Sequence, residues 1–258
     1  SDGILATGVV TASLTGVDVH HNGSSGLRYE HSSGSRIAIA SSNFSDNGLD
    51  GINTTGLSVN PVLVWTGLTL ERNGRHGARV ITGIQIENAT IRDNASSGLN
   101  GEVVLRDSLV SGNQTGISSD TFGNINLSRV TLTDNGTAIF SGRTVIIRDS
   151  YLFGNANGIT APRTLTISNT VIAGSATAIR SSSIAGSSVT LDHVTVGQAT
   201  GTALTVPAGQ LAISNSIFSA GSGTVLAVSP AVVVTSDYNL FHSTAFDAAA
   251  LSSWRALT

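Results

Sequence analysis

The residues best suited to chemistry in this sequence are concentrated between positions 20 and 79. Arginine side chains can hold the carboxylates or sulfates of an acidic glycan through paired hydrogen bonds, and carboxylates can contact sugar hydroxyls or act in acid–base catalysis. We therefore predict that any functional site lies in this stretch. Its ionisable residues are His20, His21, Arg28, Glu30, His31, Arg36, Asp46, Asp50, Glu71, Arg72, Arg75, His76 and Arg79.

A smaller set within this stretch forms the predicted substrate-binding site, without an assigned catalytic residue. Arg28 and Arg79 would bind the acid groups of a glycan. Glu30 and Asp50 would contact hydroxyl groups, or form a weak calcium site with few ligands. We expect no other cofactor. The full predicted set is Arg28, Glu30, His31, Asp50, Arg75, His76 and Arg79.

The adjacent residues His20 and His21 raise the question of a metal site. Neighbouring side chains on a β-strand point to opposite faces, so the two imidazoles would diverge. No third metal ligand recurs at a fixed distance from them in the sequence. We therefore predict no metal site.

A repeat of about 22 residues must position these side chains. Each repeat begins with an apolar residue, followed two positions later by a turn residue and three further on by an apolar one. A period of this length is typical of solenoids, in which each coil buries its apolar face against its neighbours. The first positions are Leu14, Ile39, Trp65, Ile86, Leu105, Leu127, Ile147, Ile167, Leu191 and Ile213.

Within each repeat the apolar residues are spaced by two, as at Val145 and Ile147, which is typical of a strand. The third position is mostly Gly, Asn or Asp, residues that tolerate a left-handed bend. We expect two short strands to meet there at a one-residue corner, with Trp65 in the core. The ten corner positions are Gly16, Ser41, Gly67, Asn88, Asp107, Arg129, Asp149, Asn169, His193 and Asn215.

Asparagine forms a second column of the repeat. Coils stacked about 4.8 Å apart would bring these amides into register, so that each donates to the carbonyl group of the amide in a neighbouring coil. The predicted ladder is Asn22, Asn47, Asn73, Asn94, Asn113, Asn135 and Asn155.

This ladder, with a Gly–apolar pair three or four residues after each Asn, resembles the right-handed parallel β-helix repeat of the pectate-lyase-like superfamily over residues 11–241. The resemblance implies an all-β, right-handed parallel β-helix solenoid of about ten coils, on the order of 48 Å long. It implies a single domain over 1–258. The tail 242–258, which contains Trp254, is similar to the closing segment of such domains and implies a short C-terminal helical cap.

Enzymes of that superfamily carry acidic clusters, often with calcium, and a basic residue on one outward strand. This sequence has no Asp-Pro-His-Asp or Arg-x-Pro-x-x-Arg motif, and it has no lysine to act as a base. Its 16 acidic residues mostly stand alone. These absences disfavour a lyase or hydrolase of the usual pattern.

Two columns of the repeat contain the ionisable residues of the first coils. His21, Asp46, Arg72 and Asp93 directly precede the ladder, and we interpret them as a surface ion-pair ladder. A second, outward column places arginine on alternate coils, about 10 Å apart. It consists of Arg28, Asn53, Arg79, Asn100, Ser118, Phe140 and Thr160.

The composition excludes several partners. A net charge of −3 and 11% charged residues give no basic surface for nucleic acid or anionic membrane. No apolar run reaches the roughly 18 residues of a membrane span. No Met occurs, so we expect the chain to be part of a longer protein. No signal peptide is visible, and the absence of Cys fits an exported or an intracellular protein equally. For the location we expect the outside or the surface of a bacterial cell.

Three functions remain open from the sequence. The first is a non-catalytic extracellular or cell-surface module that displays, adheres to or binds polysaccharide. The second is a polysaccharide lyase, hydrolase or epimerase with its groove over the first three coils. The third is a self-assembling fibre or trimeric spike segment, because the ends of a solenoid offer unpaired strand edges. We favour the first.

Overall fold

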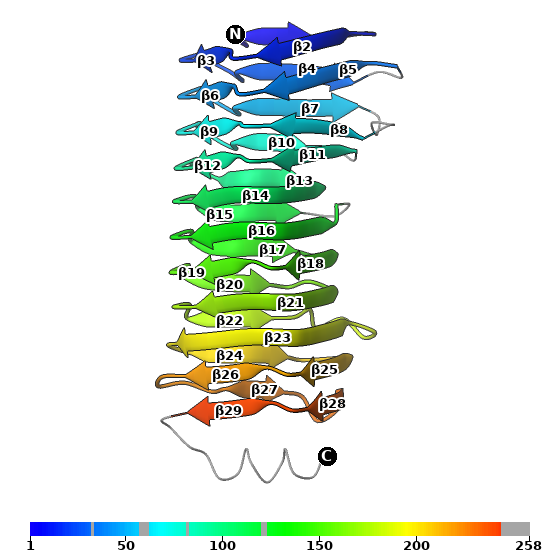
Figure 1. Ribbon diagram of the computed structural model, residues 1–258, viewed down its shortest axis with the longest axis vertical. Helices are drawn as coiled ribbons and strands as arrows, with labels where there is room; N and C mark the ends of the chain where they lie inside the picture. Colours follow the sequence, from blue (N-terminus) through cyan, green and yellow to red (C-terminus); the bar gives the residue numbers. More distant parts are fainter. Residues whose placement is uncertain (32–33, 57–61, 81–82, 120–122, 244–258) are drawn as a thin grey trace.

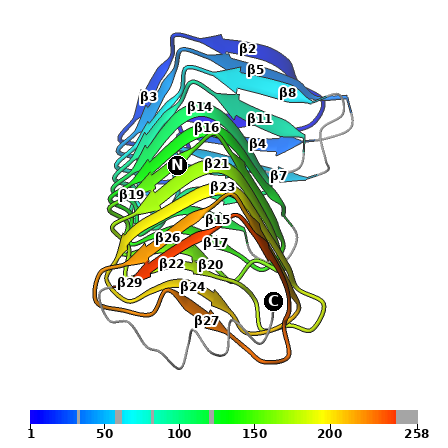
Figure 2. The same cartoon turned by 60° about the horizontal axis from the view of Figure 1, so that its bottom comes forward.

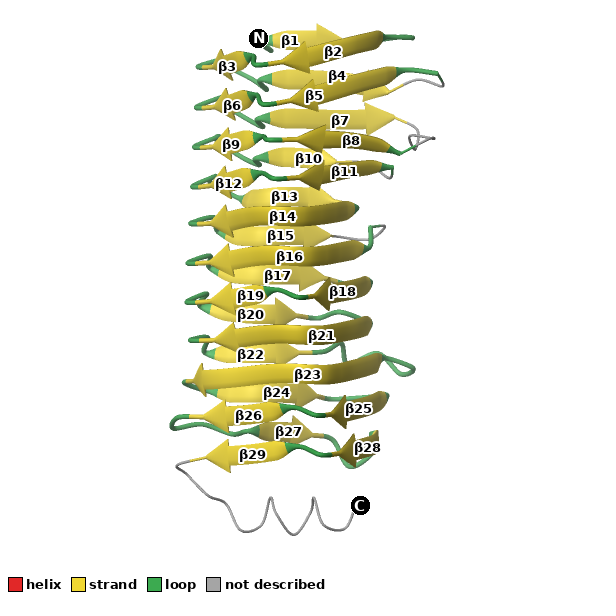
Figure 3. Ribbon diagram, viewed as in Figure 1, coloured by secondary structure: helices red, strands yellow, loops and turns green. Residues whose placement is uncertain are grey.

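The computed structural model describes residues 1–31, 34–56, 62–80, 83–119 and 123–243. Within these ranges the chain forms a parallel β-solenoid of about ten coils, made of strands joined by turns and loops (Figures 1 and 3). No helix in these ranges is long and apolar enough to cross a membrane. The predicted all-β solenoid is therefore confirmed at this level of detail.

Each coil contributes to three faces, which we name A, B and C (Figure 2). Face A is an 11-stranded parallel sheet. Its strands are β1 (Ile4–Ala6), β4 (Leu27–His31), β7 (Ile52–Gly56), β10 (Ala78–Val80), β13 (Ser97–Gly101), β15 (Thr115–Ser119), β17 (Thr137–Ser141), β20 (Asn157–Thr160), β22 (Thr177–Arg180), β24 (Thr202–Val206) and β27 (Leu226–Val228).

Faces B and C form one 18-stranded sheet that bends once in every coil. Face B contains β2 (Thr11–Thr15), β5 (Arg36–Ala40), β8 (Leu63–Thr66), β11 (Ile84–Glu87), β18 (Thr144–Arg148), β25 (Gln210–Ser214) and β28 (Val233–Asp237). Face C contains β3 (Asp18–His20), β6 (Asn43–Ser45), β9 (Thr69–Glu71), β12 (Thr90–Arg92), β19 (Tyr151–Phe153), β26 (Ile217–Ala220) and β29 (Leu240–Ser243). The strands β14 (Val103–Ser111), β16 (Ile125–Thr133), β21 (Thr164–Ala173) and β23 (Ser188–Ala199) run through both faces.

Two boundaries of the solenoid differ from those expected. Strand β1 pairs in parallel with β4, so the coils begin before residue 11. The predicted helical cap over 242–258 is not supported, because His242 and Ser243 belong to strand β29. The rest of that segment, 244–258, lies outside the described residues.

The corner between faces B and C has the predicted left-handed residue. All ten predicted corner positions have positive φ, from 45° at Asn169 to 65° at Gly67, and Tyr238 adds an eleventh at 51°. The position that follows often carries a hydroxyl that bridges two coils. Ser150 is an example, because its Oγ accepts from the Val130 N–H at 3.1 Å and donates to the Arg148 carbonyl at 2.7 Å.

The asparagine ladder is also present, at the corner between faces C and A. Each amide donates to the next one along the chain, as from Asn73 Nδ2 to Asn94 Oδ1 at 2.9 Å and from Asn94 Nδ2 to Asn113 Oδ1 at 2.9 Å. The same Oδ1 accepts the backbone N–H of the preceding ladder residue, from Asn73 to Asn94 at 3.1 Å. The amides thus satisfy backbone groups that the corner leaves unpaired.

The interior is filled by apolar side chains from all three faces. Trp65 is fully buried, as expected, and its Nε1 donates to the Ile37 carbonyl at 2.7 Å. Tyr29 and Phe44 are also fully buried. Side chains of this kind each contribute roughly 1.5–3 kcal/mol by leaving water, so the core stabilises every coil.

The ladder ends after Asn155, where the equivalent position is Ser175. This residue is fully buried, and its Oγ has no hydrogen-bond partner within the described residues. An asparagine there would accept from Asn155 Nδ2, as Asn155 itself accepts from Asn135 Nδ2. We therefore expect Ser175→Asn to raise the free energy of unfolding by about 1 kcal/mol.

Urea denaturation measures this change, and Ser181→Asn is the matched control. Ser181 is also buried, with an Oγ that lacks a partner among the described residues, but it is not a ladder position. The control variant is expected to be less stable than the wild type. Equal destabilisation by the two substitutions would show that the ladder cannot be extended at this coil.

Candidate functional site

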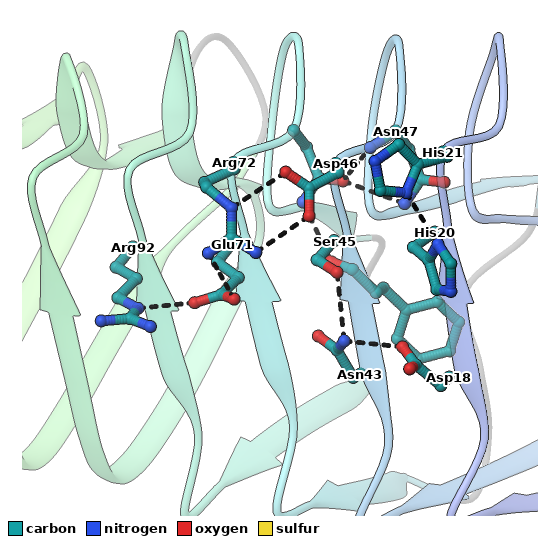
Figure 4. A network of polar contacts seen from close by, with 12 residues as sticks. Asp18, His20, His21, Asn43, Ser45, Asp46, Asn47, Glu71, Arg72 and Arg92 are labelled. Atoms are coloured by element: carbon teal, nitrogen blue, oxygen red, sulfur yellow. Dashed lines mark hydrogen bonds and ion pairs between the residues drawn. The ribbon is translucent and has the colours of Figure 1, made fainter.

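The first coils carry a network of charged side chains on face C and its corner with face A (Figure 4). Arg72 binds Asp46 through two hydrogen bonds, from Nε and Nη2, both of 2.9 Å. Glu71 accepts ion pairs from Arg72 at 2.5 Å and from Arg92 at 2.6 Å. The predicted ladder His21–Asp46–Arg72–Asp93 is thus present in part, as the Asp46–Arg72 ion pair, and no ion pair of His21 or Asp93 with another described residue occurs. Glu71 and Arg92 join the network from the neighbouring strands β9 and β12.

The network keeps its carboxylates ionised. Hydrogen bonds from Arg72 lower the pKa of Asp46 below its usual range. Burial alone would raise the pKa of Glu71, but the hydrogen bonds from Arg92 and Arg72 outweigh it and lower the pKa. A general acid needs the opposite shift, so neither carboxylate is suited to donate a proton at neutral pH.

The two adjacent histidines converge, which corrects the expectation that they point to opposite faces. His20 Nδ1 lies 2.7 Å from His21 Nδ1 (Figure 4). The reason is that His21 lies just after the end of strand β3. Its φ of 56° places it in the corner, where the alternation of side chains along a strand no longer applies. Within the described ranges, no group of three His, Cys, Asp or Glu side chains is arranged to hold a metal.

Three members of the predicted binding set meet at the corner between faces C and A. Asp50 is fully buried and accepts from Arg75 Nε at 2.8 Å. It also pairs with Arg75 Nη2 and accepts the backbone N–H of His76 at 3.2 Å. His76 Nδ1 in turn accepts the Ser97 N–H at 3.3 Å. These contacts tie one coil to the next, and the Asp50 carboxylate has no exposed surface to offer a glycan.

Another part of the predicted set lies on the outer surface of face A. Strand pairing aligns Arg28 with Asn53 and Asn53 with Arg79. Arg28 Nη2 contacts Glu30 Oε1 at 2.6 Å, and both side chains are partly exposed. Arg79 is exposed, and its guanidinium makes no hydrogen bond or ion pair with any other described residue. His31 ends strand β4, and its side chain lies outside the description.

The outward column on face A continues along the rod as predicted. Pairing carries it from Arg79 to Asn100, Ser118, Phe140 and Thr160. Arg180 follows in the same column. The structure thus brings Arg28, Glu30 and Arg79 together on one flat surface and places Asp50, Arg75 and His76 in a separate structural cluster.

Sequence reasoning overlooked the aromatic residues Tyr151 and Phe153 on face C. Both side chains are 44% exposed, while Leu152 between them is buried. Their rings are stacked, with centroids 6.0 Å apart and planes 16° from parallel. The alternation of Tyr151, Leu152 and Phe153 along one strand was the signal that could have indicated an outward aromatic pair.

Comparison with known proteins yields no family. No protein-family model and no curated protein match this chain. Among solved structures, it is similar to ORF18 of Geobacillus virus E2, with a TM-score of 0.45 and 11% sequence identity. The match covers 95% of this chain and 55% of ORF18, so the chain spans about half the length of that protein.

Proposed function

We propose that this chain is a non-catalytic extracellular or cell-surface module, a rod that binds acidic polysaccharide through face A. The observation that supports this most directly is the column of Arg28, Asn53 and Arg79, aligned on three neighbouring strands. One strand, β7, lies between the strands of the two arginines, so two inter-strand spacings place their backbones about 10 Å apart. Such a spacing suits successive acid groups of a chain lying along the solenoid axis.

The availability of the guanidinium groups supports the same function. Arg79 is exposed and has no partner among the described residues, and Arg28 shares a surface ion pair with Glu30. Exposed ion pairs contribute only about 0–1 kcal/mol, so a sulfate or carboxylate of a ligand could replace Glu30 at little cost. The planar guanidinium would hold such a group through two parallel hydrogen bonds.

The ion pairs and pKa values of the carboxylates in the first coils favour binding over catalysis. Asp46 and Glu71 have lowered pKa values and are held by arginines. Asp50 is buried against Arg75. In the described part of the first coils, these groups stabilise the solenoid, and the pKa values of Asp46 and Glu71 are shifted away from that of a general acid.

The fold class belongs to the same proposal. We infer a right-handed coil of the pectate-lyase-like class, supported by the asparagine ladder and the left-handed corner residues. One such fold serves many functions, so the proposed activity depends on face A and not on the class.

Replacing both surface arginines should weaken binding selectively. We expect Arg28→Ala with Arg79→Ala to reduce affinity for an acidic polysaccharide about tenfold, which corresponds to about 1.4 kcal/mol. Affinity electrophoresis through gels containing alginate, pectate or a sulfated glycan measures the effect. Arg148→Ala with Arg163→Ala is the charge-matched control, because both of these arginines are exposed elsewhere on the rod.

Two results would contradict the proposal. New chain ends or unsaturated products in the polysaccharide, formed by the wild type, would identify an enzyme. Equal loss of affinity in the two double variants would show that net charge alone governs retention.

A further inference from the structure

The outward side chains of face C include charged ones in the first coils, whereas the outward positions of its C-terminal part carry no Asp, Glu, Lys or Arg. We name as the uncharged strip the outward positions of face C on β14, β16, β19, β21, β23, β26 and β29. None of them is Asp, Glu, Lys or Arg. Its exposed apolar side chains include Leu109, Tyr151, Phe153, Ile217 and Leu240, which are 37–58% exposed.

One row of the strip is continuous, although the pairing of β23 with β26 shifts register between Val196 and Ala199. One row of outward side chains runs from Leu109 through Thr131 to Tyr151. It then passes from Tyr151 to Val171, on to Thr195 and Ile217, and ends at Leu240. Apolar residues and threonines therefore alternate irregularly along a flat surface.

The surroundings of the strip are polar. At the corner between faces B and C, Arg129 binds Asp107 through hydrogen bonds of 2.6 and 2.8 Å. Asn169 donates to Asp149 at 2.7 Å on the same corner. An apolar surface with a polar rim is typical of a binding site rather than of a random part of the surface.

The dimensions of the strip decide between its potential occupants. Seven strands at about 4.8 Å spacing and three residues of strand width give about 29 by 10 Å, or roughly 300 Å². A stable interface with a second protein, including a second copy of this chain, needs about 800 Å² on each partner. The strip is too small for that, and its shape suits a long, thin ligand.

The chemistry narrows the choice to an uncharged polymer. Without cations the strip offers no ion pair to an acidic chain, and burying charges on it would carry a desolvation penalty. Sugar rings present apolar C–H faces and a periphery of hydroxyl groups. The apolar side chains match the first, and the hydroxyls of Thr131 and Thr195 match the second.

We propose that the uncharged strip binds a neutral polysaccharide chain. This inference rests on the proposed function, which it extends by a second surface and a second class of glycan. The paired rings of Tyr151 and Phe153 form its central contact, because aromatic side chains contribute the largest apolar area at a binding surface. Face A then takes acidic chains, and face C takes neutral ones.

Two binding assays test the proposal. Insoluble cellulose and chitin are used in co-sedimentation, and glucomannan, dextran and a soluble β-glucan are used in affinity electrophoresis. We expect at least one of these polymers to bind the wild type. Tyr151→Ala with Phe153→Ala should weaken that binding at least tenfold, whereas Tyr151→Phe, which keeps the ring, should retain it. Phe140→Ala is the matched control, since Phe140 is also 44% exposed but lies on face A.

The outcomes separate this inference from the proposed function. Binding of an acidic polysaccharide that depends on Arg28 and Arg79, without binding of any neutral one, removes only the inference on face C. Unchanged neutral binding in the Tyr151/Phe153 double variant also overturns it. So does a wild-type oligomer, detected by light scattering, that the same variant dissociates. If no acidic polysaccharide binds, the proposed function of face A is contradicted, whether or not a neutral polysaccharide binds.

Discussion

Asn94→Ala is expected to lower the free energy of unfolding by about 3–5 kcal/mol. Asn94 is 2% exposed and lies inside the ladder. Its Oδ1 accepts from Asn73 Nδ2 and from the Asn73 backbone N–H. Its Nδ2 donates to Asn113 Oδ1, and also to the Leu70 carbonyl at 3.0 Å. Alanine leaves these groups without partners in a site closed to water, and each orphaned group costs about 1–3 kcal/mol.

Urea denaturation of the variant tests this effect, with Asn157→Ala as the control. Asn157 is exposed and lies in strand β20, outside the ladder. Its replacement should change stability by less than about 0.5 kcal/mol, as for most surface substitutions. If the two variants lost similar stability, the ladder amides would be a consequence of coil stacking and not a cause of it.

Arg75→Ala is expected to cost about 3–4 kcal/mol of stability, at the lower end of the range for breaking a buried ion pair. Among the described residues, the substitution leaves the carboxylate of Asp50, which has no exposed surface, with the His76 N–H as its one remaining partner. A buried charge without a counter-ion is much less stable than a paired one. Asp50→Ala should lower stability less than Arg75→Ala, because the arginine that it leaves unpaired is 38% exposed and can be solvated by water.

The double variant Arg75→Ala with Asp50→Ala shows whether the charge is responsible. It should recover at least 1 kcal/mol relative to Arg75→Ala, since no isolated carboxylate remains. The folded fraction of Arg75→Ala, of Asp50→Ala and of the double variant should bind acidic polysaccharide as the wild type does. If these variants lost binding while their stability stayed unchanged, Asp50 and Arg75 would be part of the glycan-binding site.

The fold could be predicted because its geometric demands recur in every coil. A one-residue corner requires positive φ, and Gly16, Asn88 and Asp149 recur at that position as residues that meet the demand. Identical amides in stacked coils can bond only to each other. The outward column through Arg28, Asn53 and Arg79 followed from the same repeat, and strand pairing confirms it.

A second left-handed column escaped prediction. His21, Asp46, Arg72 and Asp93 all have positive φ, although arginine is seldom found in this conformation. A following ladder asparagine does not account for this geometry, because Gln198 in the same column has φ 55° and precedes Ala199. The signal that could have indicated it was Asp46 and Asp93 in the early coils, together with Gly112, Gly154 and Gly174 in the later ones.

The candidate site was predicted only in part, for a related reason. Arg28 and Arg79 lie within strands, where alternation fixes the outward direction. Asp50 and Arg75 lie in the turn before the strand, where no such rule applies. The sequence shows their charges but not that one turn brings Arg75 onto the Asp50 of the preceding coil.

The end of the ladder gives the rod a direction. From Asn22 to Asn155 each ladder amide donates to the next, whereas Ser175 and Ala199 take the ladder positions of the later coils. Those coils are joined by strand pairing, apolar contacts and single side-chain hydrogen bonds, such as the one from the Val194 N–H to Ser216 Oγ. Local opening reaches first those segments whose closure has the smallest free energy. We therefore expect fraying from the C-terminal end to slow where the amides begin. Arg28 and Arg79 lie on the part of face A that the ladder reinforces, whereas Arg180 lies beyond it. The uncharged strip spans this boundary, and its outer part would be the first surface to be lost.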